Sequence, residues 1–148
     1  MKNKPEILAP VGNVENLKAA VLSGADAVYF GLGNFNARRN AQNFTDEQIE
    51  NAIKYCHSRG VKVHITLNTL IKDTEIKDAI ETVKTICKIG ADAIIVQDFG
   101  LAKVIREKFP ALPLHASTQM SGHNAEMGTL LSELGFTRMV IARETPFE

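Results

Sequence analysis

The fold class is indicated by the stretch Gly24-Ala25-Asp26-Ala27-Val28-Tyr29-Phe30-Gly31 and its near copy Gly90-Ala91-Asp92-Ala93-Ile94. In each copy a glycine closes an amphipathic helical stretch and a short apolar run begins, which is typical of the passage from a helix to a buried strand. The copies are 66 residues apart (24 to 90), the length of two strand–helix units. The repeat therefore predicts a chain of β/α units with parallel strands.

Outward from these copies, short apolar runs alternate with amphipathic stretches. A capping box at Thr45 and Gln48 marks one helix start. The absence of a GxGxxG turn favours a barrel over an open dinucleotide-binding sheet. We predict an α/β fold, a parallel (β/α) TIM-barrel-like domain, with a flat six-stranded sheet as the alternative. The predicted strands are 6–9, 26–31, 61–68, 92–97, 114–117 and 138–142, and the predicted helices are 13–22, 45–59, 73–89, 101–109 and 122–134.

The last residues, Thr145-Pro146-Phe147-Glu148, have the composition of a helix start. A closed barrel of this kind has eight strands, and six are predicted. We therefore expect residues 1–148 to form one N-terminal barrel-like domain that is incomplete at its C-terminus. Its unpaired strand edges predict either cover by another chain or self-association.

Composition narrows the classes of partner. Lys+Arg and Asp+Glu both number 17, so bulk charge does not predict nucleic-acid binding, although a local basic patch is compatible with it. Neither a signal peptide nor a membrane-spanning apolar run is present, which predicts a cytoplasmic protein without a membrane partner. Cys56 and Cys87 follow helical apolar spacing and are predicted to be buried free thiols that bind no metal.

In a parallel barrel, the working groups lie at the carboxyl ends of the strands. Polar residues gather at these predicted positions, and ten of them are candidates for the site. The candidate catalytic residues are His115, Ser117 and Glu144, and the candidate substrate-binding residues are Asn13, Arg38, Asn68, Gln97, Asp98, Gln119 and Arg143.

Several candidates have a structural alternative. Ser117 and Asp98 have the chemistry of helix caps. The Arg143 guanidinium fits a carboxylate or phosphate, but a surface ion pair with Glu144, worth about 0–1 kcal/mol, is the other reading. Arg38 fits three interpretations equally: a contact with RNA, a contact with a substrate carboxylate, or a position in a solvated loop.

The predicted strand 61–68 carries Lys62, His64, Thr66 and Asn68 on one face and apolar residues on the other. Because helices cover the outside of a barrel, we expect His64 and Thr66 to point inward. For His64 we favour a hydrogen-bonded interior layer over catalysis. His115 and Ser117 also share a strand face, but a Ser–His pair needs a third group and a defined geometry before it becomes a nucleophile.

An ordered set of short motifs resembles the start of the collagenase-like peptidase family U-32. The set comprises Pro5–Asn13, Gly24–Gly31, Asn43–Thr45, Val96–Asp98, His115–Met120 and Ala142–Glu144. The resemblance implies a barrel-like N-terminal domain in a longer protein. Some family members are named as proteases, and several are linked to hydroxylation of a tRNA wobble uridine, an rRNA cytidine or a ubiquinone precursor.

The hydroxylation-linked members resemble iron–sulfur proteins whose four cysteines lie downstream of the region that matches this chain. Cys56 and Cys87 do not match those positions, so we expect no cofactor here and an iron–sulfur cluster only in a longer protein.

Three functions follow as hypotheses. By family name the protein is a peptidase acting on a peptide, although HExxH, nucleophile-elbow and aspartic-dyad motifs are absent. The alternative is C5 hydroxylation of tRNA uridine or rRNA cytidine, with the barrel mouth holding the base or a small anionic co-substrate. The third is a non-catalytic interaction fragment, and we expect residues 1–148 alone to be inactive.

Overall fold

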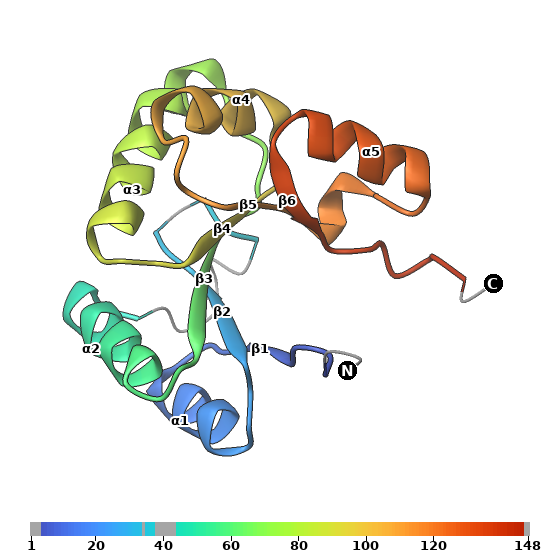
Figure 1. Ribbon diagram of the computed structural model, residues 1–148. Coiled ribbons are helices and arrows are strands. Elements are labelled where there is room, and N and C mark those ends of the chain that lie inside the picture. Colours follow the sequence, from blue (N-terminus) through green and yellow to red (C-terminus); the bar gives the residue numbers. More distant parts are fainter. Residues whose placement is uncertain (1–3, 34, 38–43, 147–148) are drawn as a thin grey trace.

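The computed structural model describes residues 4–33, 35–37 and 44–146. Six strands form a single sheet in which each strand pairs in parallel with the next along the chain. The sheet curls into a half-barrel with the helices on its outer side (Figure 1), so the flat sheet considered as the alternative is wrong. The strands are β1 (Leu8–Pro10), β2 (Ala27–Gly31), β3 (Lys62–Leu67), β4 (Ala93–Val96), β5 (Leu114–Ala116) and β6 (Phe136–Met139).

Helices connect successive strands, as parallel pairing requires. Two short 3-10 turns, η1 (Asp73–Glu75) and η2 (Thr118–Met120), follow β3 and β5. None of the helices in the described part of the chain is long and apolar enough to cross a membrane. The helices are α1 (Val14–Leu22), α2 (Asp46–His57), α3 (Ile76–Lys88), α4 (Phe99–Lys108) and α5 (Ala125–Glu133).

The Gly-Ala-Asp repeat aligns neighbouring strands. Gly24 and Gly90 have φ values of +90° and +82°, which an L side chain rarely adopts, and they turn the chain out of α1 and α3. The carboxylate of Asp26 then accepts a hydrogen bond from Ile7 N, and that of Asp92 accepts one from Val63 N. Each aspartate thus binds the backbone at the start of the preceding strand.

The core lies between the sheet and its helices. In β3, Val63, Ile65 and Leu67 are fully buried, as the predicted outward-facing apolar pattern requires. They belong to one apolar cluster with helix residues such as Leu17 and Ile86. Each fully buried side chain of this size contributes about 1.5–3 kcal/mol to folding, so this layer holds the half-barrel together.

The sixth strand begins earlier than predicted. Gly135 turns the chain at the end of α5, and Phe136 pairs at once with Leu114. An irregularity in the pairing then places Arg138 opposite His115, and β6 ends at Met139 rather than at residue 142. The helix expected from Thr145 extends into residues 147–148, which lie outside the described residues.

One of the two cysteine predictions is wrong. Cys56 is a buried free thiol, as predicted, but Cys87 is exposed. The buried stripe of α3 runs through Ala79, Ile80, Val83 and Ile86. Cys87 follows Ile86 directly and is therefore rotated by about 100° away from this stripe.

Candidate functional site

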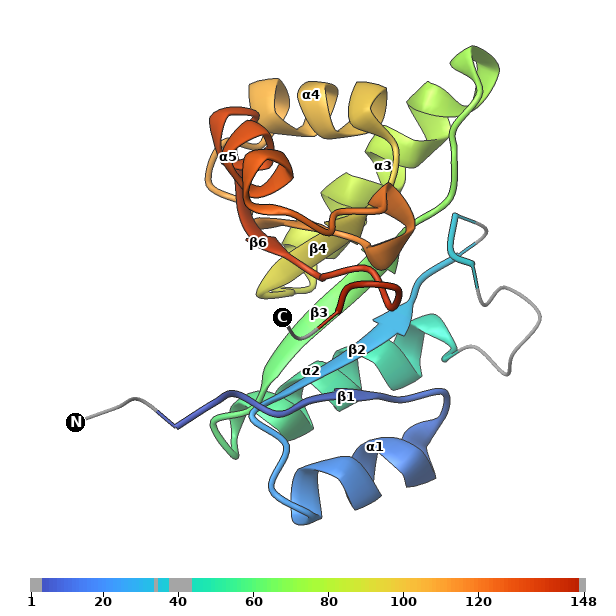
Figure 2. The ribbon, with the colours of Figure 1, turned by 90° about the vertical axis from the view of Figure 1, so that its right-hand side faces the viewer.

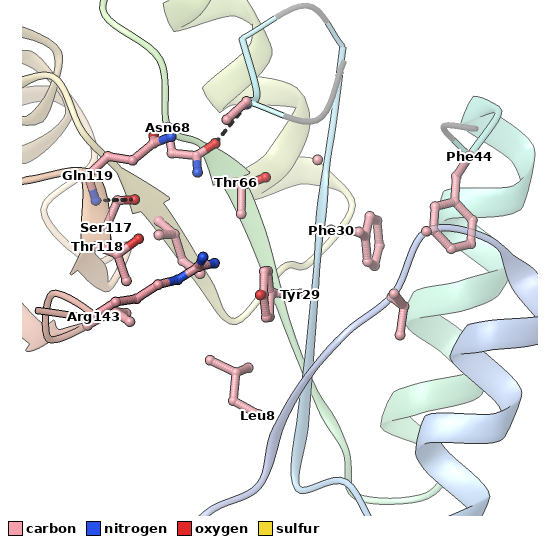
Figure 3. Close-up of a pocket in the computed structure, with 16 residues that line it drawn as sticks. Leu8, Tyr29, Phe30, Phe44, Thr66, Asn68, Ser117, Thr118, Gln119 and Arg143 are labelled. Atoms are coloured by element: carbon pink, nitrogen blue, oxygen red, sulfur yellow. Dashed lines mark hydrogen bonds between the residues drawn. The ribbon is translucent and has the colours of Figure 1, made fainter. Parts of the chain in front are cut away.

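A cavity of about 370 Å³ opens among the carboxyl ends of the strands. This is where ligands bind in parallel β/α barrels. In Figure 3 the labelled polar side chains come from three main segments: β3, the β5–η2 segment and the segment after β6. The lining residues are Leu8, Val11, Gly12, Tyr29, Phe30, Gly31, Ala37, Phe44, Thr66, Asn68, Ile95, Ser117, Thr118, Gln119, Val140 and Arg143.

Local hydrogen bonds set the positions of the polar groups. The Ser117 hydroxyl accepts a hydrogen bond from Gln119 N at 3.3 Å, which caps η2 and directs Thr118 and Gln119 along the rim. At the end of β3, Asn68 Oδ1 accepts one from Ala37 N at 3.1 Å and so ties the loop after β2 to this strand. Within the described residues, the Asn68 amide N–H groups and the Ser117 hydroxyl proton have no hydrogen-bond acceptor and are available as donors.

The cavity favours a ligand with acceptor atoms or negative charge. None of the described residues that line it is acidic, and Arg143 is the one charged residue among them. In Figure 3 the Arg143 side chain reaches across the mouth toward Tyr29, and among the described residues it forms no ion pair. A guanidinium offers a planar set of donors that matches a carboxylate or phosphate.

Beneath the cavity, His64 and His115 form a buried pair. They are only 2% and 6% exposed, and their rings meet edge to face with centroids 4.8 Å apart. The Nδ1 atom of each ring has no hydrogen-bond partner among the described residues. Burial lowers the pKa of His115 to about 4, helped by His64 and Arg138, and burial also lowers the pKa of His64. Both rings are therefore neutral near pH 7.

An ionic group lies at the opposite, amino-terminal end of the interior. The Glu6 carboxylate pairs with Lys62 of β3 at 3.2 Å and with Arg138 of β6. Hydrogen bonds from these two cations lower the Glu6 pKa. The segment before β1 is thereby tied to β6 across the open side of the half-barrel.

Four of the ten candidate residues meet at the cavity: Asn68, Ser117, Gln119 and Arg143. His115 lies beneath it, with its ring against His64. Glu144 is exposed, Gln97 is half-buried, and neither lines the cavity. Asn13 and Asp98 cap α1 and α4, the role considered above for Asp98. Arg38 lies outside the described residues.

The aromatic residues of the cavity wall were not among the predicted site residues. Tyr29, Phe30 and Phe44 line it, and the rings of Phe30 and Phe44 lie 4.6 Å apart. Strand alternation could have placed Tyr29 on the inward face, because it pairs in register with His64. For Phe44, which lies one residue before the α2 cap, no pattern in the sequence gives the contact.

Metal or cluster binding finds little support in this chain. The described residues contain no group of three His, Cys, Asp or Glu side chains that could hold a metal ion. Cys56 is buried on α2, where burial raises its thiol pKa to about 11, whereas Cys87 is exposed on α3. A four-cysteine cluster does not fit these residues.

The geometry defines a parallel β/α half-barrel with a cavity at its carboxyl-end face. Residues 12–148 match the model of peptidase family U32. The chain belongs to this family, as its motifs predicted, and members of the family are named as enzymes of more than one kind.

Relatives carry two kinds of name. The chain is 39% identical over 139 residues to the 23S rRNA 5-hydroxycytidine C2501 synthase of Escherichia coli, covering 94% of this chain and 21% of that protein. It is 37% identical to tRNA hydroxylation protein P1 of Bacillus subtilis and 38% to a collagenase of Porphyromonas gingivalis, each over 96% of this chain and 34% of the relative. The chain thus spans about a fifth to a third of these relatives.

The fold has a solved counterpart in the U32 peptidase Mk0906. The two superpose with a TM-score of 0.78 at 13% identity, over 95% of this chain and 60% of the other. The likeness confirms the barrel-like α/β fold.

Proposed function

We propose that this chain is the ligand-binding N-terminal part of a protein that hydroxylates a pyrimidine base of RNA at C5. The observation that carries the proposal is the cavity mouth, with Arg143 and several hydrogen-bond donors and without an acidic side chain among its described lining. Such a mouth suits a small anionic co-substrate or the carbonyl groups of a pyrimidine. Two relatives that are 39% and 37% identical to this chain are named for RNA hydroxylation.

The geometry around Ser117 gives less support to peptide hydrolysis. A serine nucleophile needs a base within hydrogen-bond reach and a third group that orients the base. The Ser117 hydroxyl instead caps η2, and the candidate base His115, two residues before it, has its ring against His64. The peptidase nevertheless remains the second candidate, because Ser117 lines the cavity and one relative is named a collagenase.

Hydroxylation transfers oxygen and needs a redox partner, which the residues of this chain do not provide. In this proposal they bind and orient the ligand, and the iron–sulfur cluster implied by the family resemblance belongs to a longer protein. Arg143 would hold an anionic group, while Asn68 and Ser117 would donate hydrogen bonds.

The test compares RNA nucleosides from a strain lacking the gene with those from complemented strains. We expect a 5-hydroxylated pyrimidine nucleoside to disappear on deletion and to return with the wild-type gene. Arg143→Ala should fail to restore it at equal protein level, whereas Glu144→Ala, at an exposed neighbour outside the cavity, should restore it. Unchanged nucleosides, together with peptide cleavage that Ser117→Ala abolishes, would establish the peptidase instead.

A further inference from the structure

A rigid ledge borders the cavity on the carboxyl-end rim, formed by the loop after β3 and the first turn of α4. Asp98 joins the two segments: Oδ1 accepts a hydrogen bond from Leu101 N at 2.7 Å, and Oδ2 accepts one from Ile71 N at 3.1 Å. In Figure 2 this loop and the start of α4 lie together on the side to which the strands point. Asn68, which lines the cavity, is two residues before Leu70, so the ledge adjoins the ligand site.

The ledge exposes apolar side chains. Leu70 is 71% exposed and Phe99 is 47% exposed. Among the large apolar side chains exposed in the described part of the chain, Phe99 alone is aromatic. A single exposed apolar residue is ordinary on a protein surface, but the hydrogen bond from Ile71 N to Asp98 brings the segments that carry Leu70 and Phe99 together, at the rim of a cavity.

We propose that Phe99, supported by Leu70, is a stacking platform for an unpaired RNA base next to the nucleotide that enters the cavity. The inference rests on the proposed function and adds the contact that recognises a flanking base. Proteins read single-stranded RNA largely by stacking bases on aromatic side chains. The ledge is held by two hydrogen bonds to one carboxylate, so little ordering free energy is spent when a base stacks on it.

The charges around the ledge limit how strongly it can attract a phosphate backbone. Lys72 directly follows the apolar pair of Leu70 and Ile71, is exposed, and forms no ion pair within the described ranges. Two nearby carboxylates accept hydrogen bonds from backbone N–H groups, Asp98 from Ile71 N and Glu75 from Lys72 N at 2.9 Å, and such bonds do not cancel the charge of a carboxylate. Asp73 opposes Lys72 in charge, so stacking supplies most of the affinity and Lys72 a small, salt-dependent part.

The experiment measures binding of the full chain to a fluorescein-labelled RNA hairpin with a pyrimidine-rich loop, by fluorescence anisotropy at two salt concentrations. We expect Phe99→Ala to raise the Kd about 5- to 150-fold, the equivalent of about 1–3 kcal/mol for one stacked base. Phe99→Trp should bind at least as tightly as wild type. Leu22→Ala is the matched control, because Leu22 is 78% exposed but lies at the far end of α1.

A fully paired RNA stem should bind more weakly than the loop, and Lys72→Gln should reduce the salt dependence by about one unit of slope. Equal affinities for Phe99→Ala and wild type, equal binding of loop and stem, or no RNA binding at all would overturn the platform. The nucleoside experiment decides the proposed function separately. A strain complemented with Phe99→Ala that keeps full hydroxylation would reject the platform while the proposed function stands.

Discussion

The ring of His115 meets that of His64 edge to face across β4, at a centroid distance of 4.8 Å. Both side chains point into the half-barrel, one residue pair below Thr66 and Ser117, which line the cavity. The contact joins β3 to β5 directly beneath the ligand site. Because burial keeps both imidazoles neutral, the floor of the cavity carries no added positive charge near pH 7.

The first prediction concerns acid stability. The pKa of His115 is about 4 in the folded protein, below the ordinary histidine value of 6.5 that applies to the unfolded chain. The unfolded state therefore binds more protons between these values, so the free energy of unfolding falls as pH drops from about 6.5 to about 4. The loss from His115 is about 3 kcal/mol, and His64 shifts in the same direction. Urea unfolding at a series of pH values measures it.

In this experiment His115→Gln removes the titrating group. The variant should lose less stability than wild type over the same pH range, whereas His123→Gln, which changes an exposed histidine, should follow the wild-type curve. Parallel curves for His115→Gln and wild type would show that His115 does not cause the acid loss.

The second prediction concerns Gly31, at the end of β2. A Cβ atom there would overlap the side chain of Asn36, which is 1% exposed and donates a hydrogen bond to Gly33 O at 2.8 Å. Gly31→Ala should therefore cost about 1–3 kcal/mol and displace the cavity wall. Gly12→Ala, at a cavity position where a Cβ meets nothing within 4 Å, is the control. Equal urea midpoints for the two variants would contradict the overlap.

How far the sequence predicts this structure depends on the range of the interactions. The alternating faces of β3 and the capping of α2 by Thr45 are local, and the structure reproduces both. The start of β6 depends on pairing with β5, and the exposure of Cys87 depends on which stripe of α3 meets the sheet. Neither the start of β6 nor the exposure of Cys87 can be predicted from a few consecutive residues.

The same distinction applies to the site. Asn68, Ser117, Gln119 and Arg143, chosen for their strand-end positions, line one cavity, because parallel strands place their carboxyl ends together. The roles of these residues are still predictions. The ring contact between His64 and His115 joins residues 51 positions apart (64 to 115), and it follows from how the sheet curls. No spacing rule supplies that curvature.

The third prediction separates the two copies of the Gly-Ala-Asp repeat. Asp92 Oδ2 accepts a hydrogen bond from Val63 N at 2.7 Å and also meets His57 Nε2 at 2.8 Å, whereas the Asp26 carboxylate has Ile7 N as its one hydrogen-bond donor among the described residues. Asp92→Ala should therefore cost about 1.5–3 kcal/mol, more than the cost of Asp26→Ala. Chemical denaturation measures both, and a larger cost for Asp26→Ala would show that β1 alignment matters more than the second contact.

The fourth prediction tests whether Glu6 holds the open half-barrel together. Its carboxylate pairs with both Lys62 and Arg138, and the Glu6 and Arg138 side chains are 37% and 36% exposed. Solvent screens partly exposed pairs, so Glu6→Gln should cost only about 1 kcal/mol at low salt and less at high salt. Because hydrogen bonds from the two cations lower the Glu6 pKa, its stabilisation is present at neutral pH and is lost as pH falls through that lowered pKa.

A double-mutant cycle with Arg138→Gln isolates the contact between β6 and the segment before β1. A coupling free energy of zero at low salt would show that the pair does not connect the two edges. Lys84→Gln is the control, because it breaks an exposed ion pair within α3 and so gives the cost of losing a purely local pair.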